Sequence, residues 1–117
     1  MVESKTRKAA FLREAVRAVG LTHAVVENAR FEEVAQKAEC AGVAHLVTVR
    51  AVKADSHLFE AAGLLLGTSG RLLMFRPSHA AETDPPGFAR VSTVRLTEAP
   101  STYLSSYRRM FHVEQRR

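Results

Sequence analysis

The sequence has one cysteine, no tryptophan and few aromatic residues, which make up 7% of its 117 positions. Cys40 therefore has no partner for an internal disulfide, and a cysteine-cluster metal site is excluded. The five histidines show no metal-ligand spacing such as H-x-x-x-H, so we expect no bound metal. No apolar run approaches the ~20 residues of a membrane-spanning helix, and the first residues lack the apolar stretch of a signal peptide. These absences predict a cytoplasmic protein with no membrane partner.

The composition that is present is that of one small globular domain. Hydrophobic residues make up 46% and charged residues 25%, close to the averages for such domains. Lys and Arg total 17 against 12 Asp and Glu, and the excess is largest at the two ends, residues 1–19 and 103–117. A basic surface suits a polyanionic partner such as RNA, whose phosphates release counterions on binding. A solvated surface would give the same count.

Apolar residues recur at helical spacing in three segments. The spacing predicts an amphipathic helix over 5–19, capped by Ser4 and ended by Gly20. A short helix is expected within 30–38, with Phe31 on its inner face. A third helix is expected to begin at Asp55 or Ser56 and to carry an apolar face up to residue 66.

Short apolar runs between the helices read as strands. They lie at 24–26, 45–49 and 71–75, followed by two β-like segments at 88–97 and 102–113. The run 45–49 is nearly uninterrupted, as in a strand covered on both faces. Residues 67–70 (Gly-Thr-Ser-Gly) read as a turn, 77–87 as a polar loop, and Pro100 with Ser101 as the turn of a final hairpin. Alternating helices and strands predict an α/β fold with a mainly parallel sheet and antiparallel strands at its C-terminal edge.

Ligands of open parallel sheets bind beyond the carboxyl ends of the strands, so the residues there are candidate site residues. Glu3 precedes the first helix, where a carboxylate could accept both hydroxyl protons of a ribose; it could equally be a solvated residue of a terminus. Phe31 could lie against an adenine and Glu32 could accept from an exocyclic amine. Alternatively, Phe31 belongs to the core and the acids favour the first turn of a helix.

Arg50 directly follows the strand 45–49, where its guanidinium could hold a phosphate or a carboxylate, or could be an exposed loop arginine. The other features are weaker. Residues 67–70 lack the lysine and the length of a phosphate-binding loop. No G-x-S-x-G segment indicates a hydrolase. No residue of this chain is predicted to have a catalytic role.

Three stretches in this order resemble a known family. They are Val2-Glu3-Ser4-x-x-Arg7-Lys8-x-x-Phe11-Leu12-Arg13-Glu14, Ala29-Arg30-Phe31-Glu32-Glu33, and Val47-Thr48-Val49-Arg50-Ala51. The chain is similar to the bacterial 16S ribosomal RNA guanine-N7 methyltransferases, also called glucose-inhibited division protein B. The similarity extends over residues 2–75 and fades in the loop 77–87 and the strand pair 88–113.

The resemblance implies an S-adenosylmethionine-dependent enzyme with a Rossmann-like methyltransferase fold, acting on a guanine N7 of the small ribosomal subunit. It implies that Glu3 binds the ribose of the cofactor, that Phe31 and Glu32 flank its adenine, and that Arg50 lies at the cofactor pocket. In the family, N-terminal helices, a first strand and a glycine-rich loop precede the segment that matches. Residues 1–117 thus correspond to part of a methyltransferase domain, a fragment with about half of a cofactor site.

A missing central strand would leave exposed sheet edges, which predicts self-association. Without the glycine-rich loop, we expect little methyl transfer by the chain alone, because positioning dominates this reaction. Two other classes of function stay open. One is a non-catalytic RNA-binding remnant that uses the basic ends of the chain, and the other is an α/β interaction module that completes its sheet with a partner.

Overall fold

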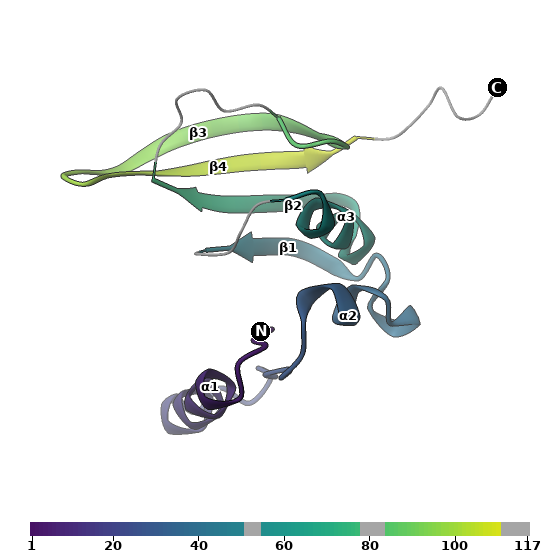
Figure 1. The fold of residues 1–117 in the computed structure, drawn as a ribbon, viewed down its shortest axis with the longest axis vertical. Helices are drawn as coiled ribbons and strands as arrows, with labels where there is room; N and C mark the ends of the chain where they lie inside the picture. Colours follow the sequence, from purple (N-terminus) through teal and green to yellow (C-terminus); the bar gives the residue numbers. More distant parts are fainter. Residues whose placement is uncertain (51–54, 78–83, 111–117) are drawn as a thin grey trace.

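The computed structural model describes residues 1–50, 55–77 and 84–110. Four strands form one sheet in the order β1-β2-β4-β3, and helix α3 (Ser56–Leu65) lies over one face of it (Figure 1). The strands are β1 (Ala44–Val49), β2 (Leu66–Arg76), β3 (Phe88–Glu98) and β4 (Ser101–Arg109). Helix α1 (Thr6–Val19) and the segment around residue 27 lie to one side, beyond β1. The last residues of the predicted strand 102–113, beyond residue 110, fall outside the described residues, as does most of the predicted loop 77–87.

Helix α1 spans Thr6–Val19, as the apolar spacing predicts. Gly20 ends it with a φ of 81°, a left-handed conformation that favours glycine, and its N–H is shared between the carbonyls of Val16 and Arg17. The predicted Ser4 cap is wrong. Lys5 occupies the N-cap position, and its backbone N–H donates to the carboxylate of Glu3 over 2.9 Å.

The predicted strand at 24–26 is reduced to a single parallel bridge between Val2 and Glu27. The N–H of Glu3 donates to the carbonyl of Glu27 over 2.9 Å, and the N–H of Glu27 donates to the carbonyl of Met1 over 2.8 Å. Val26 is buried while Val25 is 65% exposed. A strand requires hydrogen-bonded neighbours along its length. Among the described residues, this segment has only the Val2–Glu27 bridge and a hydrogen bond from the Met1 amino group to the carbonyl of Val25 over 2.8 Å.

Helix α2 covers Phe31–Ala35 and is followed by a short 3₁₀ turn, η1, at Ala38–Cys40. Its first turn carries Glu32 and Glu33, which suits the positive end of the helix dipole. The carboxylate of Glu33 accepts from the N–H of Arg30 over 2.9 Å. Val34 is buried and Phe31 packs on the core, so the predicted inner face is confirmed.

Strand β1 (Ala44–Val49) pairs in parallel with β2 (Leu66–Arg76) and forms one edge of the sheet. The prediction of a strand covered on both faces is wrong for β1, because Val47 is buried whereas Leu46 is 52% exposed. The predicted turn at 67–70 is also wrong. These residues continue β2 as an irregularity, across which the register passes from Ala44–Leu66 to Leu46–Arg71.

Helix α3 spans Ser56–Leu65 and connects β1 to β2. Asp55 is its N-cap, as predicted, and its Oδ1 accepts from the N–H of Leu58 over 3.1 Å. The helix packs its apolar side on the sheet to form the core. The buried cluster combines residues of α2, α3 and all four strands: Ala35, Val47, Val49, Leu58, Ala61, Ala62, Leu65, Leu66, Leu72, Met74, Phe88 and Tyr107.

Strands β3 (Phe88–Glu98) and β4 (Ser101–Arg109) form the predicted antiparallel hairpin, and β4 also pairs antiparallel with β2. Ser101 is the first residue of β4 rather than part of the turn. The guanidinium of Arg109 ties the hairpin to the end of α3. Its Nη1 donates to the carbonyls of Gly63 over 2.8 Å and Leu66 over 2.6 Å. The α/β class and the mixture of parallel and antiparallel strands are therefore confirmed.

Candidate functional site

Glu3 lies directly beyond the bridge that joins the N-terminal segment to residue 27. The bridge holds its backbone, and one carboxylate oxygen, Oε2, accepts from the N–H of Lys5. The side chain is half-buried rather than fully solvated. Its other oxygen has no hydrogen-bond partner within the described ranges. Glu3 is thus an anchored carboxylate with acceptor capacity left for a ligand hydroxyl.

Asn28 also belongs to the candidate site, although it is not among the site residues predicted from the sequence. With its amide nitrogen turned toward the first segment, it donates to the carbonyls of Glu3 over 3.1 Å and Ser4 over 3.2 Å. These bonds add a side-chain link to the backbone bridge between the two segments. An asparagine just after a short apolar run indicates a side chain that can bind nearby backbone. Its two acceptors, the carbonyls of Glu3 and Ser4, are known only from the fold.

Phe31 and Glu32 begin α2, three residues after Asn28. The ring of Phe31 is half-buried and packs against the hydrophobic core, which agrees with the core interpretation of this residue. The carboxylate of Glu32 forms an ion pair with the guanidinium of Arg30, with Oε2 and Nε 3.4 Å apart. About half of the Glu32 side chain is exposed, so its remaining acceptor positions face outward.

Arg50 follows β1 and is exposed. Its guanidinium carbon lies 5.3 Å from the centroid of the Phe75 ring, a cation–π arrangement. The contact arises because β1 and β2 run parallel with Val49 opposite Met74, which puts the next residues of both strands side by side. Among the described residues, no hydrogen bond or ion pair joins Arg50 to Glu3, Phe31 or Glu32.

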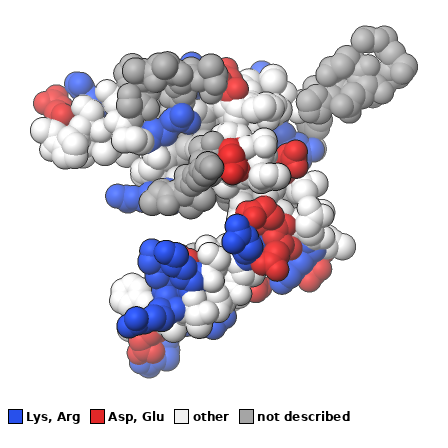
Figure 2. Space-filling view, in the orientation of Figure 1, with Lys and Arg blue, Asp and Glu red and all other residues white. Residues whose placement is uncertain are grey.

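The candidate residues therefore form two groups. We call Glu3, Asn28, Phe31 and Glu32 the first group. The Val2–Glu27 bridge and the Asn28 amide join the segment of Glu3 to that of Asn28, and Phe31 and Glu32 follow three and four residues later. Arg50 sits at the end of β1. Helix α2 and the N-terminal segment lie beyond the free edge of β1 (Figure 1). In Figure 2 basic side chains gather over α1 and acidic ones over α2, whose first turn carries Glu32 and Glu33.

The chemistry of the first group fits the adenosyl part of a nucleoside cofactor. An anchored carboxylate suits a ribose diol, and a half-exposed carboxylate next to an aromatic ring suits an adenine amine. The fit ends there. In the described part of the chain, this group offers no cation and no run of free backbone N–H groups for the carboxylate of a methionine moiety.

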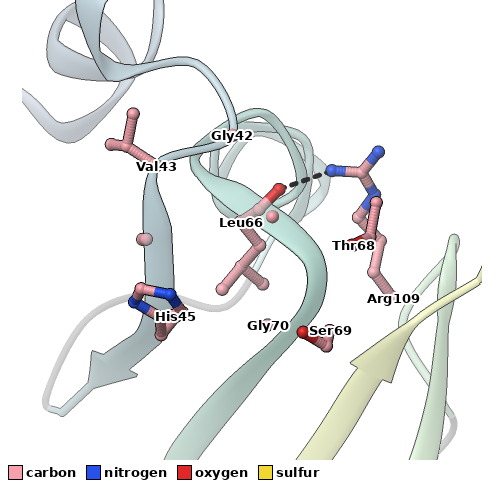
Figure 3. A pocket seen from close by; sticks show the side chains of 10 residues that line it. Gly42, Val43, His45, Leu66, Thr68, Ser69, Gly70 and Arg109 are labelled. Atoms are coloured by element: carbon pink, nitrogen blue, oxygen red, sulfur yellow. Dashed lines mark hydrogen bonds between the residues drawn. The ribbon is translucent and has the colours of Figure 1, made fainter.

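A cavity of about 380 Å³ opens at the other end of the parallel strands. Figure 3 shows it between the start of β1 and the irregular part of β2, with Gly42, Gly70 and Arg109 in its wall. The guanidinium of Arg109 is held by backbone carbonyls, and the wall is otherwise largely backbone and small side chains. The cavity is thus separate from all four predicted site residues and reflects the close approach of two strands.

Two further expectations concern metals and membranes. Across residues 1–50, 55–77 and 84–110, no cluster of three or more His, Cys, Asp or Glu side chains is arranged to hold a metal ion. A helix long and apolar enough to cross a membrane is likewise missing from these ranges.

Comparison with known proteins identifies a family. The family model described as GidB, rRNA small subunit methyltransferase G, matches residues 1–87. A curated protein named ribosomal RNA small subunit methyltransferase G, from Acidothermus cellulolyticus, is 40% identical over 89 residues. The match covers 70% of this chain and 37% of that protein. The chain thus spans little more than a third of the length of this relative.

Several solved structures described as methyltransferases or methylases share the fold at low sequence identity. A putative methyltransferase, yhhF, from Escherichia coli has a TM-score of 0.70 at 11% identity, covering 94% of this chain and 63% of that one. An S-adenosylmethionine-dependent methyltransferase from Aquifex aeolicus has a TM-score of 0.68 at 9% identity, covering 94% and 67%. An rRNA methylase from Streptococcus thermophilus has a TM-score of 0.66 at 9% identity, covering 94% and 72%. These likenesses establish the fold.

Proposed function

This chain belongs to the rRNA small subunit methyltransferase G family, and on that premise we propose that it forms the adenosyl-binding part of an S-adenosylmethionine-dependent enzyme. The proposed reaction is methyl transfer to a guanine N7 of 16S ribosomal RNA, in the cytoplasm. The observation that carries the proposal is the Val2–Glu27 bridge. It anchors the Glu3 carboxylate beside the segment that leads into Phe31 and Glu32.

Each residue has a distinct role in this proposal. Glu3 accepts from the ribose hydroxyls, and Glu32 accepts from the exocyclic amine of the adenine. Phe31 flanks the adenine with whatever part of its ring the core leaves free. Arg50 lines the same pocket from the end of β1 and is kept in place by the Phe75 ring. Asn28 acts as a positioning residue, because it joins the two segments without touching the cofactor.

The reaction makes modest demands on protein chemistry. When bound, S-adenosylmethionine supplies an electrophilic methyl group. Guanine N7 carries a lone pair and no proton, so its attack requires no general base. The residues of the protein therefore contribute by orienting the reacting groups and excluding water. Because the described residues serve only the adenosyl part, we propose that the chain by itself transfers methyl groups slowly or not at all.

Titration calorimetry with S-adenosylmethionine tests the binding role. We expect weak binding, with a Kd above about 100 μM, corresponding to less than roughly 5.5 kcal/mol of binding free energy. Glu3→Gln removes the charge of the ribose acceptor and is expected to weaken binding at least tenfold, a loss of about 1.4 kcal/mol. Glu60→Gln makes the same chemical change on the exposed surface of α3 and should leave binding unchanged.

Two results would contradict the proposal. One is equal affinity of wild type and Glu3→Gln, and the other is absence of binding at millimolar cofactor while the chain is folded by circular dichroism. Transfer of a labelled methyl group to small-subunit RNA at a rate typical of whole enzymes would instead contradict the expected impairment of the isolated chain.

A further inference from the structure

Residues 26–28 connect the two halves of the proposed cofactor site. Glu3, assigned to the ribose, is bonded to this segment, because its N–H donates to the carbonyl of Glu27 over 2.9 Å. Phe31 and Glu32, assigned to the adenine, follow the segment after a few residues of chain. A shift of residues 26–28 therefore changes the distance between the ribose acceptor and the adenine side of the site.

Arg13 contacts the same segment from helix α1. Its Nη2 donates to the carbonyl of Val26 over 3.2 Å. Val26 is only 7% exposed, so little water competes for this bond. The donor is charged, which makes the hydrogen bond stronger than one between neutral groups. Arg13 lies within the first of the three stretches that resemble the family, and the proposed function gives it no role.

Two separate contacts hold α1 against residues 26–28. The first is at the start of the helix, where the backbone bridge and the Asn28 amide join the two segments. The second is the Arg13 bond, seven residues beyond Thr6 and thus about 10 Å further along the helix axis. One contact alone would let the helix turn about it, whereas two contacts at this separation fix the angle between helix and segment.

The angle of α1 matters to Glu3 because its carboxylate is bonded to the start of the helix. Its Oε2 accepts from the N–H of Lys5, the N-cap residue. A helix that tilts away from residues 26–28 moves this N–H, and the carboxylate moves with it. On the side of α2, the segment has a weaker tie. The Lys37–Glu27 ion pair joins two half-exposed side chains with Nζ and Oε2 3.9 Å apart, and such pairs contribute little.

We propose that Arg13 is a positioning residue for the cofactor. It sets the orientation of α1 on residues 26–28 and, through the N–H of Lys5, the place of the Glu3 carboxylate relative to the adenine side. In this role Arg13 contacts the protein rather than the cofactor. The inference rests on the proposed function, because it assigns how the ribose acceptor of that site is held. An arginine that only fastened α1 for stability would instead affect every ligand of the site equally.

The ribose hydroxyls separate the two roles. Adenosine has both hydroxyls that Glu3 would accept from, and 2′,3′-dideoxyadenosine has neither. The ratio of their affinities therefore measures the contribution of the carboxylate. NMR titration of the amide signals of the full chain gives both dissociation constants even when binding is weak. We expect wild type to prefer adenosine by about tenfold and Glu3→Gln to prefer it by less than about twofold.

Arg13→Met removes the donor and keeps a side chain of similar length. It should lower the preference for adenosine below about threefold, while the affinity for 2′,3′-dideoxyadenosine stays within about twofold of wild type. Arg13→Lys retains a charged donor and should recover part of the preference. Arg7→Met makes the same change at an exposed position in the first turn of α1 and should keep the wild-type preference.

Amide hydrogen exchange supplies a readout without any nucleoside. The N–H groups of Glu3 and Glu27 form the backbone bridge. Their exchange should be about fivefold faster in Arg13→Met than in wild type, which corresponds to the loss of one hydrogen bond. Exchange at Leu72 and Tyr107, which are fully buried in the sheet, should be unchanged and would show that the variant is folded.

Four results in the variants would overturn the inference. They are an unchanged adenosine preference in Arg13→Met, an equal loss of affinity for both nucleosides, the same effect in Arg7→Met, and unchanged exchange at the bridge. Failure of the proposed function appears in other proteins. Absence of adenosine binding by wild type, or a preference that survives Glu3→Gln, would overturn the cofactor site and this inference together. A failure confined to Arg13→Met would leave the site and its dependence on Glu3 intact.

Discussion

Two glycine-to-alanine substitutions should change stability in opposite directions. Gly70→Ala is expected to lower the free energy of unfolding by about 1–3 kcal/mol, the usual cost of forcing an extra methyl group into a packed site. Gly63→Ala is expected to raise it by about 0.5–1 kcal/mol, because alanine loses less backbone entropy in a helix. The same methyl group is added in both cases, so the surroundings decide the sign.

The surroundings differ in space and in mobility. A Cβ on Gly70 would lie 2.7 Å from Cδ2 of Leu66, 3.1 Å from its Cβ and 3.1 Å from the carbonyl oxygen of Ala44. Leu66 is fully buried, so its side chain has no room to turn away, and the Ala44 carbonyl belongs to the neighbouring strand. Around Gly63, within α3, a Cβ would meet no atom within 4 Å.

Urea unfolding followed by circular dichroism measures the difference. At a slope of about 1–3 kcal/mol per molar urea, the two midpoints should differ by at least about 0.5 M, with wild type between them. Equal midpoints for Gly70→Ala and wild type would refute the reasoning, because they would mean that the junction of β1 and β2 is loose enough to admit a methyl group. Urea midpoints that fall by the same amount in Gly70→Ala and Gly63→Ala would also refute it.

Two other predictions concern helix ends and surface charge. Asp55→Ala should lower the free energy of unfolding by about 1 kcal/mol, since the Asp55 carboxylate caps α3 by accepting from the N–H of Leu58. Asp55→Asn should retain most of this stabilisation, because an asparagine side chain can cap a helix in the same way. Equal urea midpoints for the two variants would contradict the capping role. The hydrogen bond from Arg17 holds the pKa of Glu14 below its usual range, so this pair contributes stability above the ordinary carboxyl pKa that is lost as the pH falls through the lowered one. NMR titration of the carboxyl groups should show a higher Glu14 pKa in Arg17→Gln than in wild type. An unchanged pKa would show that Arg17 does not interact with Glu14 in solution.

Local signals in the sequence predicted the helices well. Residues at helical spacing and Gly20 suffice for α1, and Asp55 suffices for the start of α3, because hydrogen bonds within a few residues decide both. Ser4 misled, since Lys5 occupies the N-cap position of α1 and no side chain caps the helix with a hydrogen bond. The hairpin of β3 and β4 was likewise predictable from two β-like runs around a proline.

Strands that depend on distant partners were harder to predict. The apolar run at 24–26 has the composition of a strand but is paired at one bridge, and residues 67–70 have the composition of a turn but continue β2. In both cases the deciding interaction comes from another segment: residues 1–3 in the first and β1 in the second. Periodicity within a run contains no information about those partners.

The candidate site divides in the same way. The sequence placed Glu3, Phe31, Glu32 and Arg50 at the ends of expected strands, and their roles toward a cofactor stay predictions. It offered the core as one of two environments for Phe31, which the structure bears out. It could not show that Asn28 reaches back to Glu3, or that Arg50 covers the ring of Phe75. Each of these contacts joins segments that are brought together by the sheet.

By itself the sequence determined the α/β class, the helices, the Gly20 end of α1 and the Asp55 cap of α3, the closing hairpin and, through three short stretches, the family. Tertiary structure alone decided which strand faces are covered, how β1 and β2 fit around Gly70, and that Arg50 lies over the ring of Phe75. The physical reason is range. Capping and helical spacing act over three or four residues, whereas burial and charge pairing depend on chain segments separated by tens of residues.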